Sequence, residues 1–177
     1  MSLTNAIRRA RNICGPNEVW CITRFDRNNS TIEIYWSERT IVDAVTSYNL
    51  AGGLRNYGDH AECIMIRDFD RALTDYGQVP DIVEIFISRS PCMVSAGFNH
   101  SGIAYPIGCA SKIVTLIGQH PNIRFWDLRH DDVYWGNLAR RPDPNSNILS
   151  SSVTGISILA SLPNVSIHKF SDLDIIP

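Results

Sequence analysis

The chain has 177 residues and a mass of 19.8 kDa, enough for a domain to bury roughly 70% of its unfolded surface and fold without disulfides or metal. Hydrophobic residues make up 44% and charged residues 19% of it, which excludes disordered, collagen-like and coiled-coil proteins. Because the net charge is −2 at pH 7, a nucleic-acid partner would have to be held by local basic patches.

The first half of the chain predicts a helix followed by a β-hairpin. The helix is expected over residues 3–13, within an N-terminal segment 1–15, because its apolar side chains recur at helical spacing up to a Gly-Pro stop. Aromatic and β-branched residues predict strands over 19–25 and 31–36, joined as an antiparallel pair by the turn-forming residues between them. Residues 40–48 favour a further helix.

The rest of the chain alternates helices with strands. After a glycine-bearing turn (51–59), the pattern predicts a helix from His60 to Tyr76, a buried strand (82–88), a loop (93–108), a helix (109–119), a strand (123–128), a polar segment (129–147), a helix (148–162) and a strand (165–170). This order predicts an α/β fold of three layers, α-β-α, with a mixed central sheet of about five strands. We expect a single domain over residues 1–177, since no repeat or linker interrupts it.

The cysteines are odd in number and widely spread, unlike a secreted disulfide framework, and they leave thiols for metal binding or catalysis. They are Cys14, Cys21, Cys63, Cys92 and Cys109. The N-terminus carries arginines (8, 9 and 11) where a signal peptide would be apolar, and no run approaches a membrane span. We expect an intracellular protein, cytoplasmic or nuclear, with no membrane association.

Three short segments combine residues that carry chemistry. His60 and Glu62 open one expected helix, Cys92 follows the buried strand, and Cys109 opens the next helix. Zinc prefers imidazole nitrogen and thiolate sulfur, and three protein ligands leave a position for water. The sequence therefore predicts Zn²⁺ held by His60, Cys92 and Cys109, with Glu62 as the catalytic base.

The placement of these residues at helix starts supports a shared site. Residues two apart point about 200° away from each other in mid-helix, but in the first turn His60 and Glu62 can both reach past the helix end. Helix N-termini also favour thiolates through their unpaired N–H groups and positive dipole.

Structural interpretations compete with the metal site. Asp59 and Glu62 have the spacing of a capping box, in which Glu62 would only satisfy backbone donors. Cys92 and Cys109 could be small buried hydrophobes, which is the interpretation we adopt for Cys21 and Cys63.

The motif resembles the zinc-dependent cytidine deaminase superfamily, whose signature is H-x-E…P-C-x-x-C. His60-Ala61-Glu62 and Pro91-Cys92 match it, and the elements over about residues 17–174 resemble those of AID/APOBEC-type polynucleotide cytosine deaminases and related bacterial toxin deaminases. The resemblance implies a cytidine deaminase-like fold and hydrolysis of cytosine to uracil, with zinc ligands His60, Cys92 and Cys109 and the proton shuttle Glu62.

The resemblance also implies residues that contact the substrate. The backbone N–H of Ala61 would meet the cytosine carbonyl, Ser90 would line the pocket, and Asn56 would contact the sugar. A loop after the strand 123–128 would choose the base that precedes the target; it would present Arg129, His130, Tyr134 and Trp135.

Two features depart from the family pattern. The family separates its two cysteines by a few residues, whereas residues 93–108 intervene here and would form an inserted loop. His100 within that loop is an alternative ligand. Arg89 replaces the aromatic residue that often precedes the S-P-C motif, and it could either meet a phosphate or neutralise an acid.

The expected substrate is cytosine in single-stranded nucleic acid, DNA ahead of RNA, because a base inside a duplex cannot reach a buried metal. Aromatic and basic residues interleave over 124–126 and 129–135, as stacking and phosphate contact require, and arginines at 8, 9, 11, 140 and 141 could add phosphate contacts. Against this, one face of the strand must be core, and Asp127, Asp131 and Asp132 would repel phosphate.

Two other functions stay open. One is a free cytidine or deoxycytidine deaminase. The other is a catalytically inactive, zinc-stabilised module that binds nucleic acid or protein. If the chain is a toxin domain, an inhibitor or immunity protein is a further expected partner; the sequence leaves the oligomeric state open.

Overall fold

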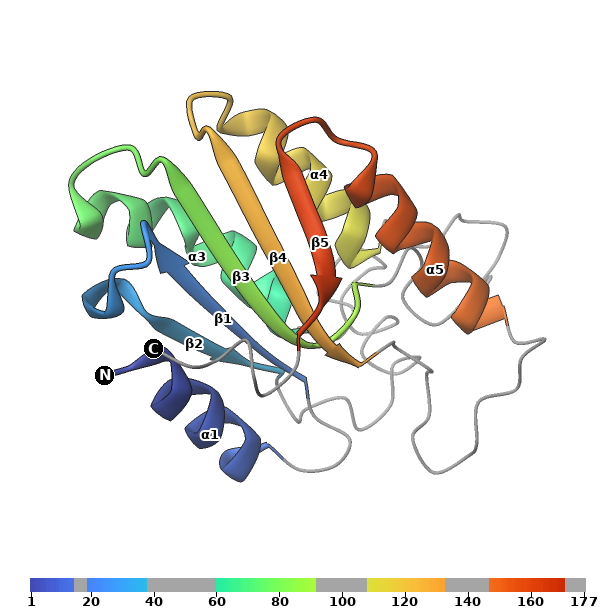
Figure 1. The fold of residues 1–177 in the computed structure, drawn as a ribbon, viewed down its shortest axis with the longest axis horizontal. Coiled ribbons are helices and arrows are strands. Elements are labelled where there is room, and N and C mark those ends of the chain that lie inside the picture. Colours follow the sequence, from blue (N-terminus) through green and yellow to red (C-terminus); the bar gives the residue numbers. More distant parts are fainter. Residues whose placement is uncertain (15–18, 38–59, 92–107, 133–146, 171–177) are drawn as a thin grey trace, which may run out of the picture.

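A computed structural model describes residues 1–14, 19–37, 60–91, 108–132 and 147–170. Its elements are α1 (Leu3–Ile13), β1 (Trp20–Phe25), the 3-10 helix η1 (Asn29–Thr31), β2 (Glu33–Trp36), α3 (Ala61–Tyr76), β3 (Ile82–Arg89), α4 (Cys109–Gln119), β4 (Phe125–Asp132), α5 (Asn147–Ala160) and β5 (Val165–Lys169). They form an α/β fold in which helices cover both faces of one sheet (Figure 1). The predicted three-layer class is confirmed.

The sheet is mixed, with strand order β2-β1-β3-β4-β5. β1 runs antiparallel to both β2 and β3, whereas β3, β4 and β5 are parallel. The parallel strands therefore end at one common edge. Figure 1 shows that α3 and α4 both begin at this edge, so their first turns face each other beside the carboxyl ends of the strands.

The predicted hairpin of β1 and β2 is confirmed, and its turn explains a slightly shorter second strand. Asp26 and Arg27 adopt left-handed backbone conformations (φ 49° and 57°), as a tight hairpin turn requires. Thr31, expected in the strand, lies in η1 and its Oγ1 accepts a hydrogen bond from the Phe25 N–H at 2.9 Å. A hydroxyl that bonds locally to the backbone competes with strand pairing.

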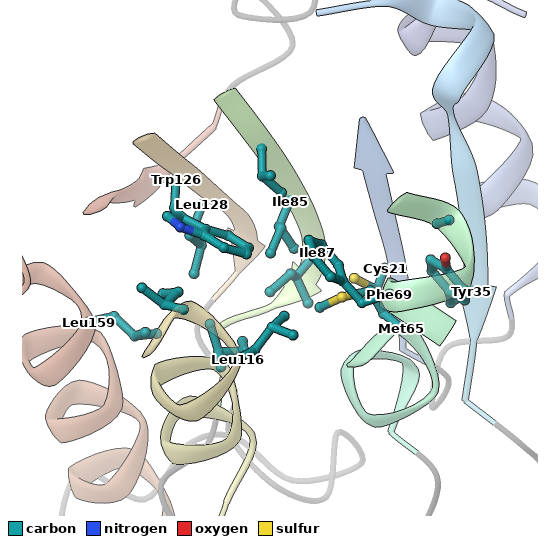
Figure 2. Close-up of a cluster of buried hydrophobic side chains, with 14 of the residues drawn as sticks. Cys21, Tyr35, Met65, Phe69, Ile85, Ile87, Leu116, Trp126, Leu128 and Leu159 are labelled. Carbon is teal, nitrogen blue, oxygen red and sulfur yellow. The ribbon is translucent and has the colours of Figure 1, made fainter. Parts of the chain in front are cut away.

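The main core lies between the sheet and the helices α3, α4 and α5. Figure 2 shows side chains from β1, β3 and β4 meeting Met65 and Phe69 of α3, Leu116 of α4 and Leu159 of α5. α3 supplies apolar residues at helical spacing and ends at Gly77, whose φ of 80° only glycine adopts without strain. This packing fixes the helix starts against the sheet.

A smaller core covers the opposite face of the sheet. α1 buries one stripe, Leu3, Ala6, Ile7 and Ala10, as its sequence spacing predicted. It packs near Trp20, Ile22, Phe86 and Phe170. α1 itself has the predicted bounds.

The main difference from the sequence prediction concerns β4. The strand was expected over residues 123–128, but it runs from Phe125 to Asp132 and includes four polar or charged residues assigned to a loop. Pairing on both sides explains the extension, because β3 and β5 each continue the ladder along this stretch.

The expected helix 40–48, turn 51–59 and loop 93–108 fall outside the described residues, apart from Gly108, which caps α4. In the described parts of the chain, no helix has the length and apolar character needed to cross a bilayer.

Candidate metal centre and active site

The first turns of α3 and α4 bring an imidazole and a thiol together. His60 is the N-cap of α3 and Cys109 is the first residue of α4. His60 Nδ1 and Cys109 Sγ lie 3.2 Å apart although the residues are 49 positions apart in the chain. Both face the positive ends of helix dipoles, which stabilise a thiolate.

The carboxylate of Glu62 belongs to the same cluster. His60, Glu62 and Cys109 each place one potential ligand atom within 4.8 Å of the other two. Glu62 is only 2% exposed, an unusual position for a carboxylate unless it is paired or functional. The structure thus joins three of the predicted chemical residues at one point.

The capping-box interpretation of Glu62 is wrong. It requires Asp59 as N-cap and Glu62 as third helical residue, but the N-cap is His60 and its side chain makes no capping hydrogen bond. Glu62 is therefore the second residue of the helix. From this place its carboxylate lies beside the imidazole of His60 and the thiol of Cys109.

Sequence reasoning missed Cys63, which was interpreted as a small buried hydrophobe. Its Sγ lies 3.9 Å from Cys109 Sγ, and Lys112 Nζ donates a hydrogen bond to it at 3.2 Å. Without a metal ion, a hydrogen bond from Cys109, helped by the Lys112 charge and opposed by burial, lowers the pKa of the Cys63 thiol to about 6. Its position three residues after His60, on the same helix face, was the available signal.

The described donors fit a zinc ion. An imidazole nitrogen beside a sulfur, in a buried setting with a carboxylate next to them, is the chemistry of a zinc site. His60 and Cys109 would hold the ion. Cys92, the third predicted ligand, lies outside the described residues, as does His100; Pro91, the residue before Cys92, follows the end of β3 at the same edge of the sheet.

Two of the predicted substrate contacts lie near the candidate site, and three others are outside the described residues. Ala61, the first residue of α3, and Ser90, just past β3, are buried, 0% and 2% exposed, near the edge where the helices begin. The Ser90 N–H donates to the Asp132 carbonyl at 2.7 Å, which ties this segment to β4. Asn56, Tyr134 and Trp135 lie outside the described residues.

Arg129 is a strand residue, which corrects its assignment to a loop. Its guanidinium donates to Asp127 Oδ2 at 3.0 Å from Nε and 2.6 Å from Nη2, and it covers the Phe86 ring at 5.4 Å. Phe86 belongs to the core beneath α1. Arg129 therefore lies on the face of the sheet away from α3 and α4, with its charge matched by a neighbouring acid.

His130 is likewise on β4 and is 5% exposed. Side chains alternate along a strand, so His130 shares the face of Trp126 and Leu128, which pack in the main core. Burial lowers its pKa, against a hydrogen bond with the Asp132 backbone. His130 thus lies on the same face as the metal-site helices, near the end of β4.

Arg89 forms an ion pair with an acid, one of the two roles that the sequence left open for it. Its Nη1 pairs with Asp132 Oδ2 at 3.3 Å, directly across the β3–β4 ladder. Of its two alternatives, neutralising an acid is the one observed.

Within the described part of the chain, the interleaved aromatic and basic residues do not form one surface. Trp126 is fully buried, and Phe125 lies at the start of β4, the opposite end from the site. Arg11 of α1 pairs with Asp131 at 3.0 Å. Of these three residues, Trp126 therefore serves the core and Arg11 an ion pair, whereas Phe125 is exposed but far from the site.

No family model matches the sequence, and no curated protein matches it. In structure, the chain is similar to the dCMP deaminase of cyanophage S-TIM5 in complex with dCMP and dUMP, with 17% identity and TM-score 0.44 over 94% of this chain and 91% of that one. The apo form of that enzyme gives 14% identity and TM-score 0.39 over 86% and 79%. The Rib2 deaminase of Aspergillus oryzae gives 12% and 0.45 over 96% and 87%. At these values the likeness is distant, so the function has to be inferred from the site itself.

Proposed function

We propose that the chain is a zinc-dependent hydrolytic deaminase of the cytidine deaminase superfamily, converting cytosine to uracil. The observation that carries this proposal is the meeting of His60, Cys109 and Glu62 within 4.8 Å at the starts of two helices. The imidazole and sulfur suit zinc, and a buried carboxylate beside them suits proton transfer. The H-x-E and P-C segments of the sequence support the same activity.

Each residue then has a chemical task. Zinc bound by His60 and Cys109, with Cys92 as the expected third ligand, supplies a Lewis acid that makes water a nucleophile near neutral pH. Glu62 takes a proton from the attacking water and passes it to ring N3. After the hydroxyl adds to C4, Glu62 takes its remaining proton and delivers it to the amine nitrogen as the C4–N bond breaks, giving uracil and ammonia. The backbone N–H of Ala61, at a helix start, would hold the base carbonyl.

For the substrate, we keep single-stranded nucleic acid as the proposal, DNA ahead of RNA, because a base must leave the duplex to reach a buried site. Three of the described arginines give this proposal no support, because Arg11, Arg89 and Arg129 are paired with aspartates. Contacts to a polymer would therefore have to come from other residues, such as Arg8, Arg9 and those of the segment 133–146. Free cytidine or deoxycytidine, which needs no phosphate contacts along a chain, is the second candidate.

A panel of substrates tests the proposal. Purified protein loaded with zinc is incubated with cytosine-containing single-stranded DNA, RNA, duplex DNA, cytidine and deoxycytidine, and uracil is measured. We expect uracil from single-stranded DNA and little from the duplex. If only the free nucleosides are deaminated, the protein is a cytidine or deoxycytidine deaminase, and the proposal of a nucleic-acid substrate is wrong.

The matched control is Glu62→Gln, which keeps the shape of the side chain and removes its proton transfer. We expect activity to fall by at least about 10²–10⁴-fold while one zinc per chain is retained. Unchanged activity would show that Glu62 is not the proton shuttle, and a wild-type protein inactive on every substrate would indicate a binding module.

A further inference from the structure

Next to the predicted metal ligands, three side chains of α3 and α4 form a chain of contacts: Lys112, Cys63 and Cys109. Lys112 Nζ on α4 donates to Cys63 Sγ on α3 at 3.2 Å, and Cys63 Sγ lies 3.9 Å from Cys109 Sγ, back on α4. Lys112 and Cys109 are one helical turn apart on α4, and Cys63 of α3 lies between their side chains. Cys109, the last member of this chain of contacts, is a predicted zinc ligand.

Cys63 is close to the metal site but, among the described residues, it does not belong to the mutually close group of donors. The mutually close set contains His60, Glu62 and Cys109, and Cys63 is not a member of it. A sulfur that touches one ligand atom, and is not within the same distance of the others, is placed to act on that ligand rather than on the metal.

We propose that Cys63 is a positioning residue whose thiol donates a hydrogen bond to the Cys109 sulfur, while Lys112 donates to the Cys63 sulfur. This inference rests on the proposed function, because it needs Cys109 to be a metal ligand. A Cys109 thiolate bound to a metal can only accept a hydrogen bond, so in the loaded site the order of donors is Lys112 N–H to Cys63 sulfur, then Cys63 S–H to Cys109 thiolate. In the metal-free chain either sulfur can donate.

The arrangement has two physical effects on Cys109. A hydrogen bond orients the sulfur and withdraws part of its negative charge, so that a metal held by it remains a stronger Lewis acid. The ammonium of Lys112 adds a positive charge near a site that already contains Glu62 and two expected thiolates. Outer partners of this kind are typically worth about 10–100-fold in metal affinity or activity.

Cobalt(II) gives a readout that does not depend on turnover, because thiolate ligands produce charge-transfer absorption whose energy reports the electron density on sulfur. Co²⁺ is titrated into the wild-type chain, Cys63→Ala, Cys63→Ser and Lys112→Met, with circular dichroism to verify folding. Cys14→Ser is the matched control: Cys14 is a half-buried thiol that caps α1.

We expect Cys63→Ala to weaken Co²⁺ binding by about 10–100-fold and to shift the charge-transfer band. Cys63→Ser, which keeps a hydroxyl donor, should restore much of the affinity, and Lys112→Met should shift the band in the same direction by less. Cys14→Ser should match the wild type in both measurements.

Three outcomes overturn the inference. If Cys63→Ala leaves both affinity and band unchanged, Cys63 has no effect on Cys109. If both Cys63 variants lose the absorption of one thiolate, Cys63 is a ligand itself. If the wild-type chain shows no thiolate absorption with Co²⁺, the proposed function fails and this inference falls with it.

Discussion

The sheet carries polar groups on both sides, charged pairs beneath its α1 face and a thiol, imidazole and carboxylate cluster at the starts of α3 and α4. In the first group, Arg24 donates to both oxygens of Glu84 at 2.6 and 2.9 Å, and Arg129 donates twice to Asp127. Each acid there meets a base in a direct, charge-balanced pair.

The second group has a different composition. His60, Glu62, Cys63 and Cys109 bring together one imidazole, one buried carboxylate and two thiols, with Lys112 at the side. Folding alone gives no reason to bury these types together, since apolar residues could fill the same helix starts more stably. The paired charges in the sheet therefore serve the fold, whereas the cluster at the helix starts is suited to metal binding and proton transfer.

The strongest test removes a metal ligand. Cys109→Ala should lower bound zinc from about one per chain to near none and abolish deamination, because a zinc site with three protein ligands rarely survives with two. Metal content by elemental analysis is the measurement. Zinc retained at full stoichiometry would contradict the assignment of this thiol.

Glu84 provides the contrasting test on the other side of the sheet. Glu84→Ala leaves the Arg24 guanidinium, 12% exposed, without its carboxylate, and breaking a buried pair costs about 3–5 kcal/mol. Urea denaturation should report this loss of unfolding free energy, while the folded variant should still bind zinc. The double variant Arg24→Met/Glu84→Leu should regain most of the stability, because it buries no unpaired charge.

Arg129 separates a structural from a nucleic-acid role. Arg129→Met should lower the unfolding free energy by about 1.5–3 kcal/mol, the worth of hydrogen bonds to a charged group. Affinity for single-stranded DNA, and its dependence on salt, should stay unchanged, because Asp127 already neutralises this guanidinium. A reduced salt slope would instead identify Arg129 as a phosphate contact.

The smallest effect concerns pH and His130. Burial lowers its pKa in the folded chain, so below about pH 6.5, the ordinary value, the unfolded chain binds more protons than the folded one. His130 therefore makes the unfolding free energy fall as pH drops from about 7 to 5. His130→Gln should flatten this part of the stability curve, and an identical slope in both proteins would exclude the effect.

The amino-acid sequence alone determined the elements and much of the candidate site. Local spacing predicted the bounds of α1 and α4, and the signals at helix starts placed His60, Glu62 and Cys109 where they could meet. These are short-range properties: apolar periodicity selects a helix, and first-turn positions decide which side chains reach beyond its end.

Only the tertiary structure decided the use of the remaining polar residues. Pairing with β3 and β5 drew Arg129 and His130 into β4, and Arg89 met Asp132 across the same ladder. Cys63 joined the site because α4 carries Cys109 and Lys112 against α3. Such contacts depend on which elements become neighbours, and spacing along one segment of chain does not contain that information.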